Sequence, residues 1–330
     1  MKAKNIISIS IALLAMAFTA CQREELDGGL CTVRMVPRVA EHTVVTRAYQ
    51  SLAEARMHDF EAGIIVDNRD KVTKEAKLRY QGGKAELLMM LEASKYHVYG
   101  YMPWREDAKY TPTMDGATIS VPSLPGLSST MATVVRPTTL EIKQGEKDVT
   151  KTLALQMDHL SAKVTPCLYL HDEYAKLRTI HIKKIEFILD EPQARDLLIT
   201  YSGNNYSVEW GTGTATTDTI ATAYRDVATY DTLSTKRGEQ AYGACYINPE
   251  QSVENLKMRV TYDVYDKVEG NNKYSITRPD VEVTNTIKQL GKGTDFKLTA
   301  GTEYRLNIKV MPTYLYSLSD NDEEFLLLAD

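Results

Sequence analysis

The residue with the most specific chemistry in this chain is Cys21, a thiol that directly follows a short apolar stretch. Two lysines near the N-terminus precede residues 6–18, which are apolar except for two serines. A stretch of this length is too short to span a bilayer and is typical of the hydrophobic region of an export signal. We therefore expect residues 1–20 to be a signal peptide.

The last four residues of this segment, 18–21, read FTAC. They resemble a bacterial lipobox, a motif at which signal peptidase II cuts before the cysteine and the thiol then carries diacylglycerol. Phe18 stands where Leu is usual, and an ordinary secretory cut after Ala20 is the alternative. Residues 22–27, QREELD, resemble the surface-export signals of lipoproteins in the Bacteroides group. These resemblances imply that Cys21 is lipidated, palmitate included, and anchors the precursor in the outer membrane at the cell surface.

Three further cysteines remain: Cys31, Cys167 and Cys245. An odd number does not make a closed disulfide framework. Cys167 and Cys245 stand in separate strand-like runs and could pair in an oxidising compartment. The favoured alternative is that both are buried free thiols.

The chain shows no pattern of catalytic residues. Its six histidines form no HExxH pair, and neither a GxSxG elbow nor a phosphate-binding glycine loop occurs. Asp158 and His159 are adjacent, but neighbours on a strand point to opposite faces. Residues 320–324, DNDEE, lack the glycine and the ligand spacing of a calcium-binding loop. The net charge of −5 and the absence of a basic patch disfavour nucleic acid. We predict a protein that is not an enzyme and needs no metal or cofactor.

The dominant period of the sequence is two. Residues 256–264 and 304–310 alternate between apolar and polar side chains, which predicts strands with one buried face. Residues 180–189 alternate as well but change phase at Lys183 and Lys184, which predicts a β-bulge there. Short strands broken by Gly and Asn turns indicate an all-β fold of sandwiches.

Other segments give weaker expectations. Residues 85–91 and 96–101 predict two strands joined as a hairpin by a turn at 92–95. Residues 33–39 predict a weaker strand interrupted by Pro37, and residues 51–60 are the best helix candidate.

The length suits two domains, each with its own core. The best boundary is the polar break at residues 144–148. We therefore expect a lipidated N-terminal segment (21–47), an N-terminal sandwich (48–148) and a C-terminal sandwich (149–330).

Three separated segments together resemble the fimbrillin family of Bacteroides-type pili. Residues 46–48, TRA, are similar to the arginine site at which major pilins are trimmed by a trypsin-like protease. Residues 155–164, LQMDHLSAKV, are similar to a strand of many fimbrillin-like chains. Residues 296–308, FKLTAGTEYRLNI, resemble a strand pair near the family's C-terminus, and the PTYLY run at 312–316 follows it. The matches keep the family's order and span most of the mature chain.

The resemblance implies two tandem transthyretin-like β-sandwich domains and assembly by strand exchange. The chain would be cut between Arg47 and Ala48, which removes a strand within residues 32–45 and leaves a groove. A terminal strand of the next subunit would fill the groove, because an added strand satisfies the unpaired backbone groups and the apolar slot. Cys31 and Pro37 are not expected in the removable strand. The expected donor lies within residues 314–328, with these exchange residues: Tyr314, Leu315, Tyr316, Leu318, Phe325, Leu326, Leu327 and Leu328.

The sequence therefore predicts a structural or adhesive subunit of a cell-surface pilus, or fimbrium, whose partners are other pilin subunits and the outer membrane. A lipid-anchored surface glycan-binding protein is the alternative and would need exposed aromatic side chains clustered on one platform. Trp104 and Trp210 are far apart in the sequence, which weighs mildly against it.

Overall fold

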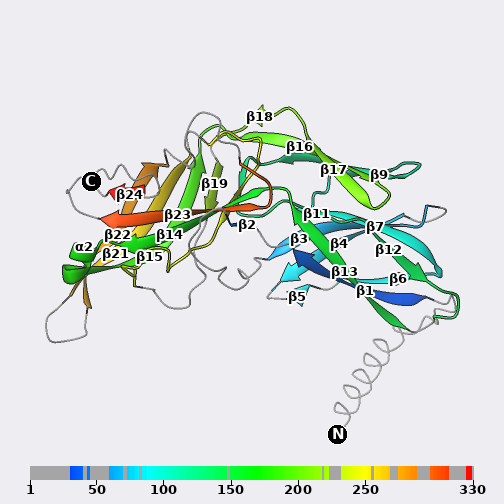
Figure 1. The fold of residues 1–330 in the computed structure, drawn as a ribbon, viewed down its shortest axis with the longest axis horizontal. Coiled ribbons are helices and arrows are strands. Elements are labelled where there is room, and N and C mark those ends of the chain that lie inside the picture. The colour runs from blue at the N-terminus through cyan, green and yellow to red at the C-terminus, as the bar shows by residue number, and fades with distance from the viewer. Residues whose placement is uncertain are drawn as a thin grey trace, which may run out of the picture.

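The protein is almost entirely β-structure, as the alternation predicts, and its strands form four sheets (Figure 1). The computed structural model describes residues 30–39, 43–44, 59–69, 73–81, 84–85, 87–146, 149–217, 219–222, 232–253, 256–267, 274–287, 298–311 and 325–328. Within these ranges the only helix is α2 (Asp172–Leu177), which His171 caps by accepting a hydrogen bond from the Glu173 amide. None of the described helices is long and apolar enough to cross a membrane.

Sheet 1 is the largest, with nine strands in the order β5-β4-β3-β7-β11-β13-β1-β6 and with β12 paired to β7. Its strands are β1 (Cys31–Val39), β3 (Phe60–Asp67), β4 (Thr73–Gln81), β5 (Lys84–Ala85), β6 (Leu87–Leu91), β7 (Ser94–Met102), β11 (Thr133–Val135), β12 (Thr138–Ile142) and β13 (Thr150–His159). β4 and β6 come from opposite ends of this order and lie against each other. Sheet 1 therefore curls around a core of its own, to which β1, β3, β7 and β13 contribute buried side chains.

Sheet 2 has five strands in the order β17-β16-β9-β8, with β18 paired to β16. Its strands are β8 (Lys109–Pro112), β9 (Gly116–Leu124), β16 (Gln193–Ser202), β17 (Asn205–Trp210) and β18 (Thr214–Ala215). It packs on the outer face of sheet 1, where Ile65 and Tyr99 share a core cluster with Ile119 and Ile199 of sheet 2. Sheets 1 and 2 form the first sandwich.

Tyr201 of β16 joins sheet 2 to the strands of sheet 1. Its hydroxyl donates towards the carbonyl oxygens of Gly100 (3.0 Å) and Val135 (3.1 Å), and the side chain is 1% exposed. Burial raises the pKa of this phenol, so the hydroxyl keeps its proton. A residue from the second half of the chain thus satisfies backbone groups of β7 and β11.

We expect Tyr201→Phe to lower the free energy of unfolding of the first sandwich by about 1–3 kcal/mol, because it leaves buried carbonyl groups without a donor. Urea denaturation followed by circular dichroism measures this loss. Tyr265→Phe, at a half-buried position on another sheet, is the control. Equal effects of the two substitutions would contradict the role of Tyr201.

Sheets 3 and 4 form the second sandwich, on the left of Figure 1. Sheet 3 has the order β10-β20-β14-β23-β2 with β24 also paired to β23, and sheet 4 has the order β19-β15-β21-β22. The strands of sheet 3 are β2 (Thr43–Val44), β10 (Leu127–Ser128), β14 (Ala162–Leu170), β20 (Cys245–Ile247), β23 (Thr302–Met311) and β24 (Phe325–Leu328). Those of sheet 4 are β15 (Arg178–Leu189), β19 (Thr219–Thr222), β21 (Lys257–Lys267) and β22 (Tyr274–Thr286).

The core of the second sandwich comes from the strands whose alternation was clearest in the sequence. Met258 and Val260 of β21 pack with Leu306 and Ile308 of β23 and are all nearly inaccessible. The pairing of β15 with β21 shifts register between Ile182 and Lys184, which confirms the predicted bulge.

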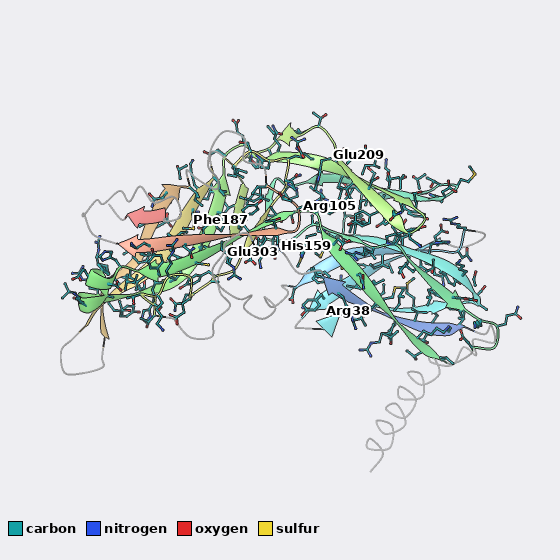
Figure 2. All side chains as sticks on the ribbon, viewed as in Figure 1. Arg38, Arg105, His159, Phe187, Glu209 and Glu303 are labelled. Atoms are coloured by element: carbon teal, nitrogen blue, oxygen red, sulfur yellow. The ribbon has the colours of Figure 1, made fainter. Side chains whose placement is uncertain are left out.

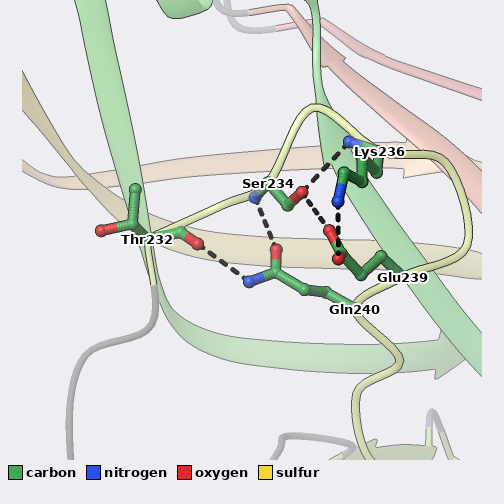
Figure 3. A network of polar contacts seen from close by, with 5 residues as sticks. All are labelled: Thr232, Ser234, Lys236, Glu239 and Gln240. Carbon is green, nitrogen blue, oxygen red and sulfur yellow. Dashed lines mark hydrogen bonds and ion pairs between the residues drawn. The ribbon is translucent and has the colours of Figure 1, made fainter.

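A loop at residues 232–240 ties the two sheets of the second sandwich together (Figure 3). The Leu233 amide donates to Ile180 of β15, and the Leu170 amide of β14 donates to Ser234. Within the loop, the Gln240 side chain accepts from the Ser234 amide at 2.7 Å and donates to the Thr232 carbonyl at 2.8 Å. Ser234 and Lys236 also contact Glu239, which completes a closed polar network.

Two sequence-based expectations about connectivity are wrong. β6 and β7 are consecutive strands but do not form a hairpin, because β6 pairs with β1 whereas β7 pairs with β3, β11 and β12. The sheets also do not separate at residue 148, since β13 lies in sheet 1 and the β16–β17 hairpin completes sheet 2. Tertiary pairing decides both points, and the local pattern does not reveal it.

Candidate strand-exchange site

The first strand of the described chain, β1, lies inside sheet 1 between two neighbours (Figure 1). It runs parallel to β13, from Thr32 opposite Thr150 to Val39 opposite Met157. On its other side it runs antiparallel to β6, from Cys31 opposite Leu91 to Met35 opposite Leu87. An N-terminal segment therefore fills a place that has hydrogen-bonding partners on both sides.

One face of β1 is fully buried in the core of sheet 1. Cys31, Val33 and Met35 are each 0% exposed, and the Cys31 thiol donates to the Val149 carbonyl at 3.2 Å. The opposite face carries Arg34 and Arg38, which are exposed, and Figure 2 labels Arg38. The alternation that sequence analysis treats as weak is thus a complete inward and outward pattern.

Pro37 does not interrupt β1, contrary to the sequence-based expectation. The Thr32 amide donates to Val149 next to β13, so even-numbered amides of this strand face β13 and odd-numbered ones face β6. Position 37 therefore faces the β6 side, where the pairing has already ended at Met35. The missing N–H of Pro37 removes no bond from the ladder.

Withdrawal of β1 would leave an apolar slot between β6 and β13. On the core side, Met89 lies opposite Val33 on β6, and Leu153 lies opposite Met35 on β13. Met89 belongs to the sheet 1 core, and the partly buried Leu153 packs against it. The slot would also present the backbone groups of two strands, so another apolar strand could fill it.

The same N-terminal segment continues to the second sandwich. β2 pairs in parallel with the start of β23, with Val44 opposite Glu303. Glu303 is 5% exposed, accepts a hydrogen bond from Thr165 at 2.7 Å and lies 3.5 Å from the Lys163 ammonium. Burial alone would raise the pKa of Glu303, but the Lys163 charge and the Thr165 hydrogen bond outweigh it and the pKa is lowered. β2 therefore ends opposite the strand position that carries a buried, ionised carboxylate, Glu303, which Figure 2 labels.

The C-terminal donor candidate lies partly in the described residues. Phe325–Leu328 forms β24, which runs parallel to β23 from Ile308 to Met311. Among the described strands, β24 has β23 as its only ladder partner, on the edge that β2 also occupies. β24 therefore has a paired strand along one edge, whereas β1 has paired strands along both edges.

No protein-family model matches the chain, and no curated protein is a detectable relative. Among solved structures, the chain is similar to a candidate cell adhesion protein from Bacteroides uniformis, with 16% identity over 85% of this chain and 93% of that one, at a TM-score of 0.37. It is also similar to a candidate adhesin from Bacteroides ovatus, with 12% identity over 92% and 93% and a TM-score of 0.32. A candidate polysaccharide-binding protein from Bacteroides thetaiotaomicron shows 9% identity over 73% and 78%, at 0.29. Similarity at these TM-scores does not establish a role for this chain.

Several predicted site residues lie outside the described residues. They are the lipidation residue, the processing pair and the first part of the donor segment: Cys21, Arg47, Ala48, Tyr314, Leu315, Tyr316 and Leu318. The helix candidate at 51–60 also lies mostly outside, and its last residue, Phe60, begins β3.

The remaining cysteines and Asp158 have structural roles. Cys31, Cys167 and Cys245 are free and buried, which confirms the favoured expectation. Burial raises the pKa of Cys167 to about 11. Asp158 accepts hydrogen bonds from Arg136 (2.7 Å) and Tyr206 (2.9 Å), so it links β13 to sheet 2.

The sequence predicts a strand at residues 85–91, but it does not reveal that β6 and β13 form the walls of the slot. Residues 150–159 alternate, but nothing local assigns them to the N-terminal sheet. The usable signal was the apolar run LLMML at 87–91, which is unusual for a strand at the end of a sheet. Leu88 and Met90 are 59% and 51% exposed on its outer face.

Proposed function

We propose that this protein is a structural or adhesive subunit of a surface fibre, made as a lipid-anchored precursor and assembled by strand exchange. The observation that carries the proposal is the position of β1. A strand at the N-terminal end of the described chain lies between two others with one face fully buried. In the folded protein it connects to the rest of the chain through its C-terminal end, towards β2.

This arrangement allows β1 to leave without breaking any connection between the other strands. A cut between Arg47 and Ala48 would separate both β1 and β2 from the rest of the chain. The slot would then lack its strand, and the edge of β23 would lose β2. An incoming strand from a second subunit would restore backbone pairing and apolar burial in the slot.

The lipid at Cys21 would hold the precursor at the outer membrane until the cut. Cys21 precedes the start of β1 by a short segment, so a cut after Arg47 would remove the lipid and β1 together. Release from the membrane and opening of the slot would be the same event. Subunits would therefore become able to polymerise only after they reach the protease.

We expect the fibre-associated protein to begin at Ala48, whereas an Arg47→Ala variant should begin at the lipidated Cys21 and stay monomeric in the membrane. N-terminal sequencing and mass spectrometry of surface material measure both. Arg38→Ala is the matched control, because Arg38 is exposed but lies within the paired strand β1. Fibres whose subunits begin at Cys21 would contradict the proposal.

A further inference from the structure

Sheet 2 does not cover the whole outer face of sheet 1, and a hollow forms where it ends. Ile65 of β3 lies under sheet 2, and its partner on β4, Glu75, has its side chain on the same face. The next pair on that face is Gly63 with Lys77. Sheet 2 ends at β8, so this face of β4 carries charged residues in place of a core. The hollow between β4 and β8 has a volume of about 260 Å³.

Three aromatic rings line the hollow: Tyr101, Trp104 and Tyr110. The Tyr101 ring lies against Gly63, where a Cβ would be 2.6 Å from a ring atom, so only glycine allows this approach. The Tyr101 hydroxyl donates to the Arg105 carbonyl at 3.1 Å. Tyr101 is therefore fixed at both its face and its tip.

The other two rings are also held before any ligand arrives. The Trp104 amide donates to the Glu61 carbonyl at 2.8 Å, and the Lys77 ammonium lies 3.4 Å from the centre of the indole ring. The Tyr110 hydroxyl donates to Asp67 at 2.7 Å. Burial raises the pKa of Tyr110, and the Asp67 hydrogen bond adds to the shift, so the phenol keeps its proton. A binding surface that is already ordered loses little entropy on binding.

A hydrogen-bond acceptor and a hydrogen-bond donor remain available at the rim of the hollow. Glu75 and Lys109 are exposed and line the hollow, and neither forms an ion pair or side-chain hydrogen bond with the described residues. Lys77 is occupied, because it pairs with Glu61 at 3.0 Å while it covers Trp104. Among the described residues, the site therefore offers one acceptor group and one donor group without a partner beside the aromatic walls.

We propose that this hollow binds a single pyranose unit of a surface glycan. A sugar ring has an apolar C–H face, which packs on aromatic rings, and hydroxyl groups that need both acceptors and donors. A lipid chain would leave the Glu75 and Lys109 charges beside an apolar ligand. A simple anion could pair with Lys109, but it would make no use of the Glu75 acceptor or of the aromatic walls. The volume lies just below the usual range for ligand pockets, roughly 300–1,000 Å³, which suits one ring.

The site involves β3, β4, β7 and β8 but not β1, so sugar binding there would not depend on strand exchange. The hollow would allow a fibre subunit to bind a surface glycan. The test uses the lipid-free mature chain, residues 22–330, with β1 in place and the protein monomeric.

The probes are methyl pyranosides of glucose, galactose, mannose, fucose and N-acetylglucosamine, titrated by ligand-observed NMR. We expect at least one to bind saturably. Trp104→Ala and Glu75→Gln should each weaken binding about fivefold, the size expected from losing one aromatic or one hydrogen-bonding contact. Glu209→Gln, an exposed carboxylate on β17, is the matched control for Glu75 and should bind normally (Figure 2).

If none of the pyranosides binds saturably, or if binding survives both Trp104→Ala and Glu75→Gln, the proposal is wrong. Glu75 is exposed, so its substitution keeps the test informative even if Trp104→Ala lowers the stability of the fold. An equal loss in Glu209→Gln would show a site elsewhere on the surface and would also overturn the assignment.

Discussion

A protein that begins at Ala48 is expected to melt about 10 °C or more below the chain that retains β1. Full burial of Val33 and Met35 contributes about 1.5–3 kcal/mol each. The loss of the β1 ladders on both sides adds to this, and each kcal/mol shifts the melting temperature by about 2–4 °C in a protein of this size. Differential scanning calorimetry of dilute protein measures the shift.

A synthetic peptide of residues 30–39 should restore the lost stability when it is added to the trimmed protein. The matched control is the same peptide with Val33→Asp and Met35→Asp, which keeps the backbone but places charges in the buried face. We expect rescue by the first peptide alone. If the trimmed protein melts like the longer chain, or if both peptides rescue equally, β1 does not fill a slot of the kind described above.

The strands could be predicted from the sequence wherever one face of the strand is buried and the other is exposed to solvent. Residues 256–264 and 304–310 alternate for this reason, and they became β21 and β23. The change of phase at Lys183 and Lys184 located the bulge, because one extra residue must move every later side chain to the other face.

The pairing of the strands could not be predicted in the same way. Residues 87–91 and 94–102 look like the arms of a hairpin because they are close in sequence, yet their partners β1 and β3 are distant. Sheet 1 curls until β4 reaches β6, which separates consecutive strands in space. The alternation of apolar and polar residues shows which face of a strand is buried, but it does not show which other strands pair with that strand.

The two candidate sites differ in how far the sequence revealed them. The N-terminal strand could be placed because it follows the predicted export segment, although Pro37 made it look weaker than it is. The aromatic hollow could not, since the distance between Trp104 and Trp210 in sequence says nothing about Tyr101 and Tyr110. Those rings meet Glu75 and Lys77 because sheet 2 stops at β8, which is a property of the assembled sandwich.

We expect the trimmed protein to form ladders of oligomers by size-exclusion chromatography, and the same protein without residues 312–330 to remain monomeric. β24 pairs along one side over Ile308–Met311, whereas the slot offers pairing on both sides. Moving the segment into the slot of a neighbour would exchange one ladder for two and bury an apolar face. A double substitution, Leu326→Lys with Leu328→Lys, should also keep the trimmed protein monomeric, although residues 312–330 are then present.

The truncated protein would still have an open slot and would lack only the strand it donates. When it is added to the trimmed protein that keeps residues 312–330, it should therefore bind at one end of a growing oligomer and stop its growth. The oligomers should become shorter as the proportion of truncated protein rises. Oligomers formed by the truncated protein alone would exclude residues 312–330 as the donor. If the truncated protein unfolds while the double Lys variant stays folded and still polymerises, the segment serves its own sandwich. In that case the exchanged strand must come from elsewhere in the chain.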